Sequence, residues 1–272
     1  MEELPNMPQL CFGTMGFGYS DWAGTFYPRG MRSSDYLSHY ARHFGTVELD
    51  TTFHATPPIS RVEHWAAVTP DDFRFCVKTP KKITHDGHLE HRCAEMNEFL
   101  NVMRVFGPKL AAVLIQLPPS CGIDQFGSLE HFLKSLPDDL RFAVEFRNAT
   151  WGQQRTLDLL REHRCALVTA EYLTRPAQIN VTTDFLYIRW IGEHERFKEL
   201  DHEQMDVSSN LQWWKEEVER TVRSHQIQNI WGFFNNDYSG YAIATCRRFM
   251  GMMGLEVPQV LPPQEVQGKL FG

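Results

Sequence analysis

The chain has 272 residues and a hydrophobic fraction of 42%, enough for a large core, and its length suits one α/β barrel of about 250 residues. The formal net charge of −7 disfavours a broad nucleic-acid surface, because non-specific binding requires many Lys and Arg side chains to neutralise phosphates. No uninterrupted apolar stretch approaches the roughly 20 residues of a membrane span, so we expect no membrane partner.

Eight short apolar runs follow one another along the chain, and each predicts a strand. Continuously apolar strands are typical of a parallel sheet whose two faces are both buried. The average spacing of roughly 31 residues fits one strand, one helix and two connections, the unit of a parallel crossover. In chain order the runs are residues 10–14, 46–49, 73–77, 111–115, 142–144, 165–168, 185–188 and 230–234.

Segments with helical periodicity lie between these runs. Apolar residues share one face of segment 34–44, and Leu211, Trp214, Val218 and Val222 also repeat at helical spacing. Residues 60–63 have the form of a capping box, which predicts a helix start at residue 60. The sixth and seventh runs lie too close together for a full helix, so an irregular sixth unit is expected.

The alternation of strands and helices predicts an α/β fold. Eight units fit either a closed (β/α)8 TIM-type barrel or an open doubly wound sheet, and we predict the barrel because eight strands close it. We expect a single domain over residues 1–272. Residues 1–9 would form an N-terminal extension, and residues 258–272 would form an extended C-terminal tail on the surface.

Acidic residues at the ends of two runs are the first candidate catalytic groups. The carboxyl ends of parallel strands meet at one edge, and this edge carries the active site in TIM barrels. Glu48 and Glu145 occupy such ends, and paired carboxyl groups can divide acid and base work when their surroundings separate their pKa values. The alternative is that each glutamate only takes part in a structural ion pair.

Three cations, Lys78, Arg147 and Arg189, also lie at or just after strand ends. Guanidinium groups suit phosphate and carboxylate, so these cations predict a small anionic ligand, with neutralisation of the two glutamates as the alternative. Other expected ligand contacts are Gln116, held by a rigid Pro-Pro turn, and Asn235 and Asn236, which lie where barrels often bind phosphate. Trp22 and Trp151 are expected to expose aromatic rings beside the same cleft.

A histidine-rich segment follows the third run and raises the question of a metal. His85 is a candidate proton donor or ligand contact, whereas the spacing of His85, His88 and His91 matches no zinc signature, so no metal is expected at these three. A glycine-rich segment after the first run lacks the third glycine and the helix of a dinucleotide fingerprint. The leading interpretation therefore requires no cofactor, and a divalent metal is kept as an alternative.

The six cysteines lie far apart without a C-x-x-C pair, which disfavours a disulfide framework or a zinc ribbon. The first ten residues carry two acids and lack the pattern of a secretory signal. Both observations lead us to expect a cytoplasmic protein.

Motifs spread over nearly the whole chain resemble the YecE-like family, also described as domain of unknown function seventy-two. The resemblance implies a TIM-type barrel and marks the motif residues as cleft residues, but it implies no reaction. The motifs are Phe12-Gly-Thr, Trp22 with Phe26-Tyr-Pro, Thr46-Val-Glu48 with Thr52-Phe, Phe75-Cys-Val-Lys78 with Thr84-His85, Leu114-Ile-Gln116-Leu-Pro-Pro, Glu145-Phe-Arg147 with Trp151, and Phe234-Asn235-Asn236-Asp with Gly240-Tyr-Ala.

The chain departs from the family pattern at a few positions. Asp50 and His54 stand where Asn and Tyr are usual, and Arg189-Trp-Ile-Gly replaces Arg-Leu-His-Gly. The absence of that histidine argues against a mechanism that needs a second imidazole. An altered or lost activity is therefore an alternative to an active enzyme.

Three functional hypotheses follow. The leading one is a hydrolase or lyase that acts on a small anionic substrate, phosphorylated or not, with Glu145 as acid or base, Glu48 as its partner and His85 as proton donor. The second makes Glu48, His85 and Glu145 ligands of a divalent metal in a hydrolase. The third is a non-catalytic module that binds a metabolite or nucleic acid, with bases stacked on Trp22 and Trp151. The oligomeric state is left open.

Overall fold

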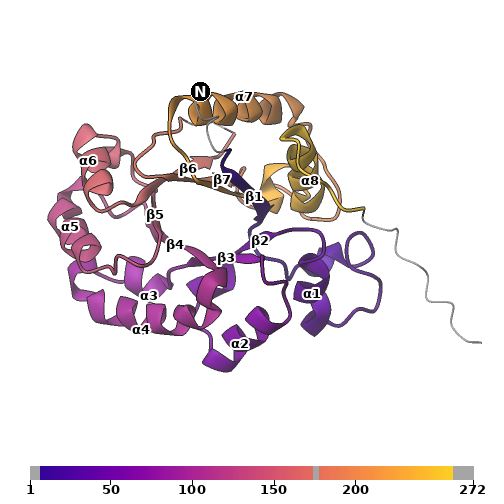
Figure 1. Cartoon of the computed structure of the whole chain (residues 1–272), viewed down its shortest axis with the longest axis horizontal. Helices are drawn as coiled ribbons and strands as arrows, with labels where there is room; N and C mark the ends of the chain where they lie inside the picture. The colour runs from indigo at the N-terminus through magenta and orange to yellow at the C-terminus, as the bar shows by residue number, and fades with distance from the viewer. Residues whose placement is uncertain (1–6, 174–177, 260–272) are drawn as a thin grey trace, which may run out of the picture.

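Eight parallel strands form a nearly closed barrel in the computed structural model, which describes residues 7–173 and 178–259 (Figure 1). Neighbouring strands pair in the order β1-β8-β7-β6-β5-β4-β3-β2. The predicted (β/α)8 TIM-type barrel is therefore confirmed. The strands are β1 (Gln9–Thr14), β2 (Thr46–Leu49), β3 (Arg74–Lys78), β4 (Leu110–Leu117), β5 (Phe142–Phe146), β6 (Ala166–Glu171), β7 (Phe185–Trp190) and β8 (Asn229–Phe234).

The barrel closes between β1 and β2 without a regular ladder. One isolated bridge joins Met15 to Glu48, and the hydroxyl of Tyr40 connects the two strands by accepting from Thr14 N at 2.9 Å and donating to Thr46 O at 3.1 Å. A Cβ on Gly13 would lie 2.2 Å from Thr46 O, so only glycine permits this close approach. We call this region, residues 13–16 of β1 and its end with residues 46–48 of β2, the β1–β2 seam.

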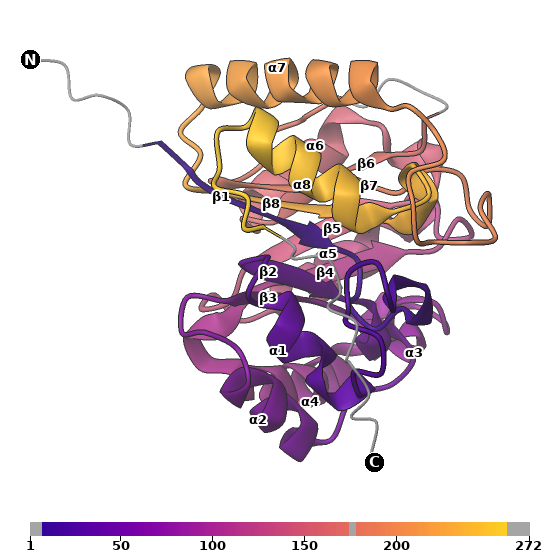
Figure 2. The same cartoon turned by 90° about the vertical axis from the view of Figure 1, so that its right-hand side faces the viewer.

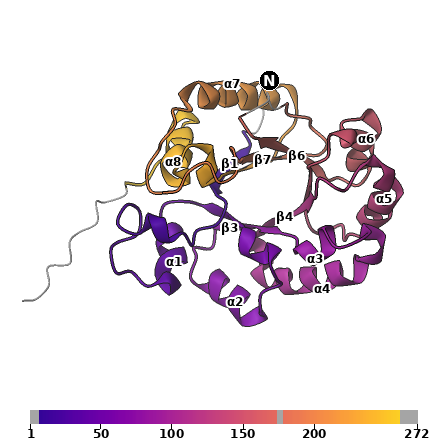
Figure 3. The same ribbon diagram turned by 180° about the vertical axis from the view of Figure 1, so that it is seen from behind.

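Helices surround the barrel, as Figure 1 and the view from behind in Figure 3 show. No helix is seen between β6 and β7 among residues 172–173 and 178–184, so the expected irregular sixth unit is confirmed in the described part. The helices are α1 (Tyr36–Tyr40), α2 (Ile59–Ala67), α3 (Lys81–Thr84), α4 (Cys93–Met103), α5 (Phe126–Lys134), α6 (Gln154–Glu162), α7 (Ser208–Ser224) and α8 (Ala242–Met252).

Two details of the helix predictions are wrong. Helix α2 begins at Ile59 after Pro58 and has no side-chain cap, because Ser60 already lies inside the helix. Proline suits a helix start because its φ of −64° is compatible with a helix and it has no backbone N–H that would need an acceptor. Segment 34–44 is also only partly α-helical, with a 3-10 turn at Ser33–Asp35 ahead of the short α1. The predicted face of α7 is confirmed, with Leu211, Trp214 and Val218 buried.

Two apolar clusters divide the core. The larger one lies between the strands and the helices, and it includes Phe12, Trp190 and Trp214. The smaller one contains the residues of the opposite strand faces, which fill the barrel itself, among them Cys76, Leu114, Tyr187, Trp231 and Phe233. Side chains alternate along a strand, so the residue two positions after an inward-facing residue also faces inward and lies nearer the carboxyl end of the barrel. The β1 arrow points towards this end in Figure 2.

The predicted extension and tail fall largely outside the described residues; residues 7–9 and 258–259 are described, and Gln9 already belongs to β1. None of the helices in the described ranges combines the length and the apolar character that a membrane crossing requires.

Candidate functional site

The inward alternation of the strands brings five predicted residues together at the carboxyl end of the barrel. Arg189 lies two residues after the buried Tyr187 on β7, and Gln116 on β4 is in register with Glu145 on β5. Glu48 faces Met15 across the β1–β2 seam, and Lys78 ends β3. We call this group, with Asp50, Arg147 and Tyr172 around it, the barrel-mouth site.

Arg189 occupies the centre of the barrel-mouth site, between two carboxylates. Its Nε and Nη2 donate to the two carboxylate oxygens of Glu48 at 3.1 and 2.7 Å, and its Nη1 donates to Glu145 Oε2 at 2.5 Å. The exposed fractions are 3% for Arg189, 0% for Glu48 and 1% for Glu145. Both glutamates and the arginine are therefore ionisable groups withdrawn from water. Their close pairing offsets the free-energy cost of removing the charges from water.

The two glutamates differ in pKa although they share one arginine. Burial raises the pKa of Glu48 to about 7, because neighbouring Asp50 adds repulsion and Arg189 does not fully offset both effects. Burial also disfavours the charged form of Glu145, but Arg189 and Arg147 outweigh it and lower the pKa of Glu145. Glu48 thus titrates near neutral pH, whereas Glu145 stays ionised.

Gln116, Arg147 and Tyr172 surround Glu145. Arg147 forms an ion pair with Glu145 and donates from Nη2 to Gln116 Oε1 at 3.3 Å. Tyr172 donates its hydroxyl to Glu145 Oε1 at 3.1 Å, and the Arg147 guanidinium lies 4.9 Å from the centre of its ring. Arg147 keeps 26% of its side chain exposed, so it can meet a ligand that approaches from solvent.

Lys78 differs from the two arginines because it forms no direct hydrogen-bonded ion pair. Its Nζ lies 3.9 Å from Asp50 Oδ1 and 4.1 Å from the centre of the Phe53 ring. Asp50 Oδ1 is buried and lacks a hydrogen-bond partner among the described residues, although Arg189 Nη2 lies 3.7 Å away. Burial lowers the pKa of the Lys78 amine.

His85 lies at the rim of this site rather than against the glutamates. Its Nδ1 is 2.8 Å from the hydroxyl of Thr84, and its ring packs 5.1 Å from that of Phe53. Burial, assisted by Lys78, lowers its pKa. His85 also lines a side cavity of about 240 Å³ that His88, Ser120 and Gln125 border.

The expectation of exposed aromatic rings was wrong. Trp22 and Trp151 are 0% and 3% exposed, because each packs among other rings and donates its indole N–H inward. Trp22 Nε1 donates to Asn236 Oδ1 at 3.3 Å, and Trp151 Nε1 donates to Cys121 O at 2.7 Å. Neither ring is therefore exposed for a base to stack on, as the third hypothesis expected.

Asn235 and Asn236 are partly committed to the fold. Asn235 Oδ1 accepts from Asp237 N, and the buried Asn236 accepts from the N–H of Ala242 at the start of α8. Asn235 is half-buried and its amide nitrogen points at Met15 Sδ, 3.6 Å away, beside Arg189. Asn235 therefore borders the barrel-mouth site, whereas Asn236 links η8 (Asn236–Tyr238) to α8.

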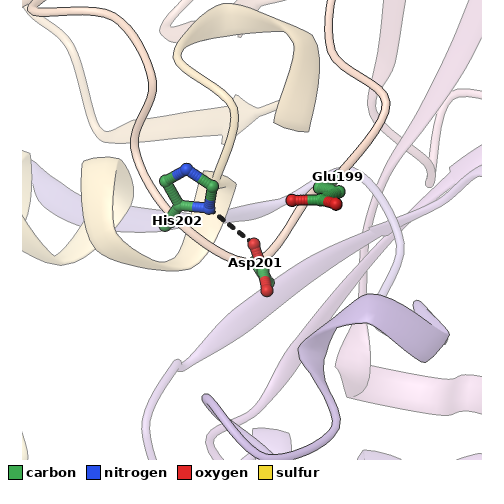
Figure 4. A group of neighbouring side chains, drawn as sticks. All are labelled: Glu199, Asp201 and His202. Carbon is green, nitrogen blue, oxygen red and sulfur yellow. Dashed lines mark hydrogen bonds and ion pairs between the residues drawn. The ribbon is translucent and has the colours of Figure 1, made fainter.

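The geometry does not favour a metal held by Glu48, His85 and Glu145. The Arg189 guanidinium already lies between the two glutamates, where a second cation would be repelled. Within residues 7–173 and 178–259, the group of three ligand atoms that lie within 4.8 Å of one another is instead Glu199, Asp201 and His202 (Figure 4). These side chains lie on the loop after β7, and His202 Nδ1 is 2.6 Å from Asp201 Oδ1.

A larger cavity of about 610 Å³ opens at the amino-terminal ends of the strands, lined by residues before β5, β6 and β7. It contains none of the predicted site residues, and its walls mix cations such as Arg141 with acids such as Asp184. Because active sites of TIM barrels lie at the opposite end, the barrel-mouth site is the better candidate.

Sequence reasoning assigned no site role to four contributors. Tyr187 donates to Glu48 Oε2 at 2.7 Å, Tyr172 binds Glu145, Met15 contacts Arg189 and Asp50 lies beside Lys78. The alternation of side chains along β7 could have placed Tyr187 on the same face as Arg189. Asp50 and Tyr172 follow strand ends, which is the same signal that identified Glu48 and Glu145.

Known proteins resemble the chain over part or most of its length. A family model described as "Protein of unknown function DUF72" matches residues 11–269. The UPF0759 protein YecE of Escherichia coli K12 is 41% identical over 112 residues, which is 41% of this chain and 41% of YecE. The UPF0759 protein YunF of Bacillus subtilis is 24% identical over 94% of this chain and 98% of YunF.

Two crystal structures share the fold. A DUF72 family protein of Thermotoga maritima has 27% identity and a TM-score of 0.75, and the superposition covers 90% of this chain and 99% of that one. A DUF72 family protein of Enterococcus faecalis has 21% identity and a TM-score of 0.69, with 93% of this chain and 100% of that one covered.

Proposed function

Because the chain belongs to the DUF72 family, whose description assigns no reaction, we propose a function from the site alone: an enzyme of the hydrolase or lyase type that acts on a small anionic substrate. One observation carries the proposal, namely Arg189 clasped between Glu48 and Glu145 at the carboxyl end of the barrel. Well-packed apolar residues often stabilise an interior as well as a buried ion pair does, so stability alone does not call for this group. Perturbed, buried ionisable groups concentrate at functional sites.

The charges of the site support an anionic ligand. Lys78, Arg147 and Arg189 provide three positive charges, and Glu48, Asp50 and Glu145 provide three negative charges when all are ionised. Protonation of Glu48, whose pKa burial raises to about 7, leaves the site with one excess positive charge. An anion would therefore bind more tightly to the protonated site, so binding and proton uptake are linked.

The catalytic roles follow from the same pKa directions. Glu145 remains ionised, with Arg189 on Oε2 and with Tyr172 and Arg147 on Oε1. In this proposal it accepts a proton from the substrate. Glu48 acts from behind Arg189 as a group that takes up or releases a proton near neutral pH. Burial and Lys78 lower the pKa of His85, so its neutral imidazole would contribute a hydrogen bond at the rim.

Ligand-induced stabilisation tests the anion-binding part of the proposal. Phosphate, glycolate and 2-hydroxyethyl phosphate are added to the protein at pH 6 and pH 8, and the melting temperature is recorded. A ligand at 100 times its Kd adds about 2.7 kcal/mol to the free energy of unfolding, which a melting curve resolves readily. We expect a larger increase at pH 6 than at pH 8.

Two variants connect this result to the site. Arg147→Gln should reduce the stabilisation, whereas Arg61→Gln, which removes a positive charge from the exposed face of α2, should leave it unchanged. Equal stabilisation in the two variants would place anion binding elsewhere. Once a substrate is found, Glu145→Gln should abolish turnover while the protein stays folded, and full activity in this variant would remove Glu145 from the mechanism.

A further inference from the structure

Two lysines of this chain are buried to the same degree but in different surroundings. Lys78 and Lys109 are each 9% exposed. Lys109 Nζ donates to three acceptors, Ala66 O and Thr69 O at 2.7 Å and Thr69 Oγ1 at 3.4 Å, as expected of a structural ammonium group. Lys78 Nζ donates no hydrogen bond to any of the residues that the structure describes. Burial without an acceptor in hydrogen-bond reach destabilises the ammonium form relative to the amine, so Lys78 gives up its proton more readily than an exposed lysine does.

The groups around the Lys78 amine suit a reactive lysine. Burial lowers its pKa, nearby Arg189 adds to this effect, and Asp50, Glu48 and Glu145 oppose it in part. Asp50 Oδ1 lies 3.9 Å from Nζ and has no hydrogen-bond partner among the described residues, so a small side-chain movement would let it exchange a proton with the amine. Lysine readily shifts its pKa when buried, which is why buried lysines serve as amine nucleophiles.

We propose that Lys78 is a covalent nucleophile that forms an imine with an aldehyde or ketone group of the substrate. This inference rests on the proposed function and sharpens it, since the substrate class becomes a small anionic carbonyl compound and the reaction a lyase step. Arg147 binds the anionic end, and the carbonyl carbon approaches Lys78 from solvent, because both side chains retain exposed atoms.

The atoms of imine formation balance with Asp50 as proton carrier. Asp50 takes one proton from the Lys78 ammonium group, and the amine nitrogen then attacks the carbonyl carbon. A second proton moves from nitrogen to oxygen to give a carbinolamine. Asp50 returns its proton to the hydroxyl group, the C–O bond breaks, water leaves and a protonated imine remains. The positive charge of Lys78 is retained, so the anion stays attracted to the site.

Reductive trapping tests the imine directly. The protein is incubated with glycolaldehyde phosphate or glyoxylate and sodium cyanoborohydride at pH 7, and peptide mass mapping locates the alkylated lysines. We expect the adduct on Lys78 to form at least tenfold faster than the adduct on exposed Lys134. The lowered pKa raises the neutral, nucleophilic fraction of Lys78, and the neighbouring cations hold the anionic aldehyde beside it, so both effects favour Lys78. Lys78→Arg should lose this adduct, and Lys134→Arg should keep it.

The matching alcohols, 2-hydroxyethyl phosphate and glycolate, separate the two proposals because they carry the anion without the carbonyl group. If they raise the melting temperature but neither aldehyde modifies Lys78, the imine is refuted and anion binding stands. If neither the alcohols nor the aldehydes have any effect, both proposals fail. Modification of Lys134 and Lys78 at equal rates would show ordinary surface chemistry and would also refute the assignment.

Discussion

Replacing Glu48 by glutamine should remove a defined part of the pH dependence of stability. Glutamine keeps the shape of the protonated side chain and cannot ionise. Burial raises the pKa of Glu48 from 4.5 to about 7 in the folded state. Folding therefore binds a proton more tightly at Glu48, so its contribution to stability is fully present below pH 4.5 and is lost as the pH rises through 7.

The size of the effect follows from this shift. A rise from 4.5 to about 7 corresponds to roughly 3 kcal/mol over the whole titration, and most of it, roughly 2–3 kcal/mol, falls between pH 5 and pH 8. Urea unfolding of wild type and Glu48→Gln across this range gives the free energy of unfolding of each. We expect the wild-type free energy of unfolding, relative to that of the variant, to decrease by roughly 2–3 kcal/mol from pH 5 to pH 8.

Two controls make the measurement specific. Arg189 and Arg147 overcome the effect of burial and lower the pKa of Glu145, so its contribution is lost only when the pH falls below the usual range of a glutamate. The difference between wild type and Glu145→Gln should therefore be constant from pH 5 to pH 8. Glu63→Gln, on the exposed face of α2, controls for the loss of a negative charge. A constant difference for Glu48→Gln as well would refute the assignment of a raised pKa to Glu48.

Two further predictions concern the β1–β2 seam. Gly13→Ala should lower the free energy of unfolding by about 2 kcal/mol or more, because the added Cβ would lie 2.2 Å from Thr46 O; urea unfolding checks this, and wild-type stability would contradict the close approach. Tyr40→Phe should lower it by about 1–3 kcal/mol, since Thr14 N and Thr46 O lose their shared partner; an increase in hydrogen exchange at Thr14 should accompany the loss, and unchanged exchange would mean that the hydroxyl does not join the strands.

The sequence was sufficient to predict the strands and the end of the barrel that carries the site. Continuous apolar runs reveal buried parallel strands, and the polar residue after each run necessarily lies at the shared edge, which is why Glu48, Glu145 and Arg189 meet. What each cation pairs with depends on distances of a few ångströms across the barrel, and no local pattern contains them. For that reason Lys78 and Arg189 looked equivalent in sequence. In the structure Arg189 donates a hydrogen bond to Glu48, whereas Lys78 lies 3.9 Å from its nearest carboxylate oxygen, on Asp50.

Aromatic residues in loops were predicted less well. Trp22 and Trp151 lie in short 3-10 segments after strands, a position that favours exposure, yet both are buried against neighbouring rings. Their burial depends on partners far away in the chain, such as Asn236 for Trp22. The helix start of α2 shows the same limit on a smaller scale, because the capping box predicted at residues 60–63 lies inside a helix that begins directly after Pro58.

The β1–β2 seam also places the Glu48 carboxylate, whose pKa burial raises to about 7, at the pair of neighbouring strands that lacks a regular hydrogen-bonded ladder. Glu48 forms the single bridge across the seam, and its backbone oxygen accepts from Gly16 N at 2.8 Å. Elsewhere around the ring, a strand is held to its neighbour by a ladder, so separating two strands there breaks several bonds together. A small separation of β1 from β2 would admit water to Glu48 while the other seven strand junctions stay intact. The buried carboxyl group would then exchange its proton with bulk solvent by this route.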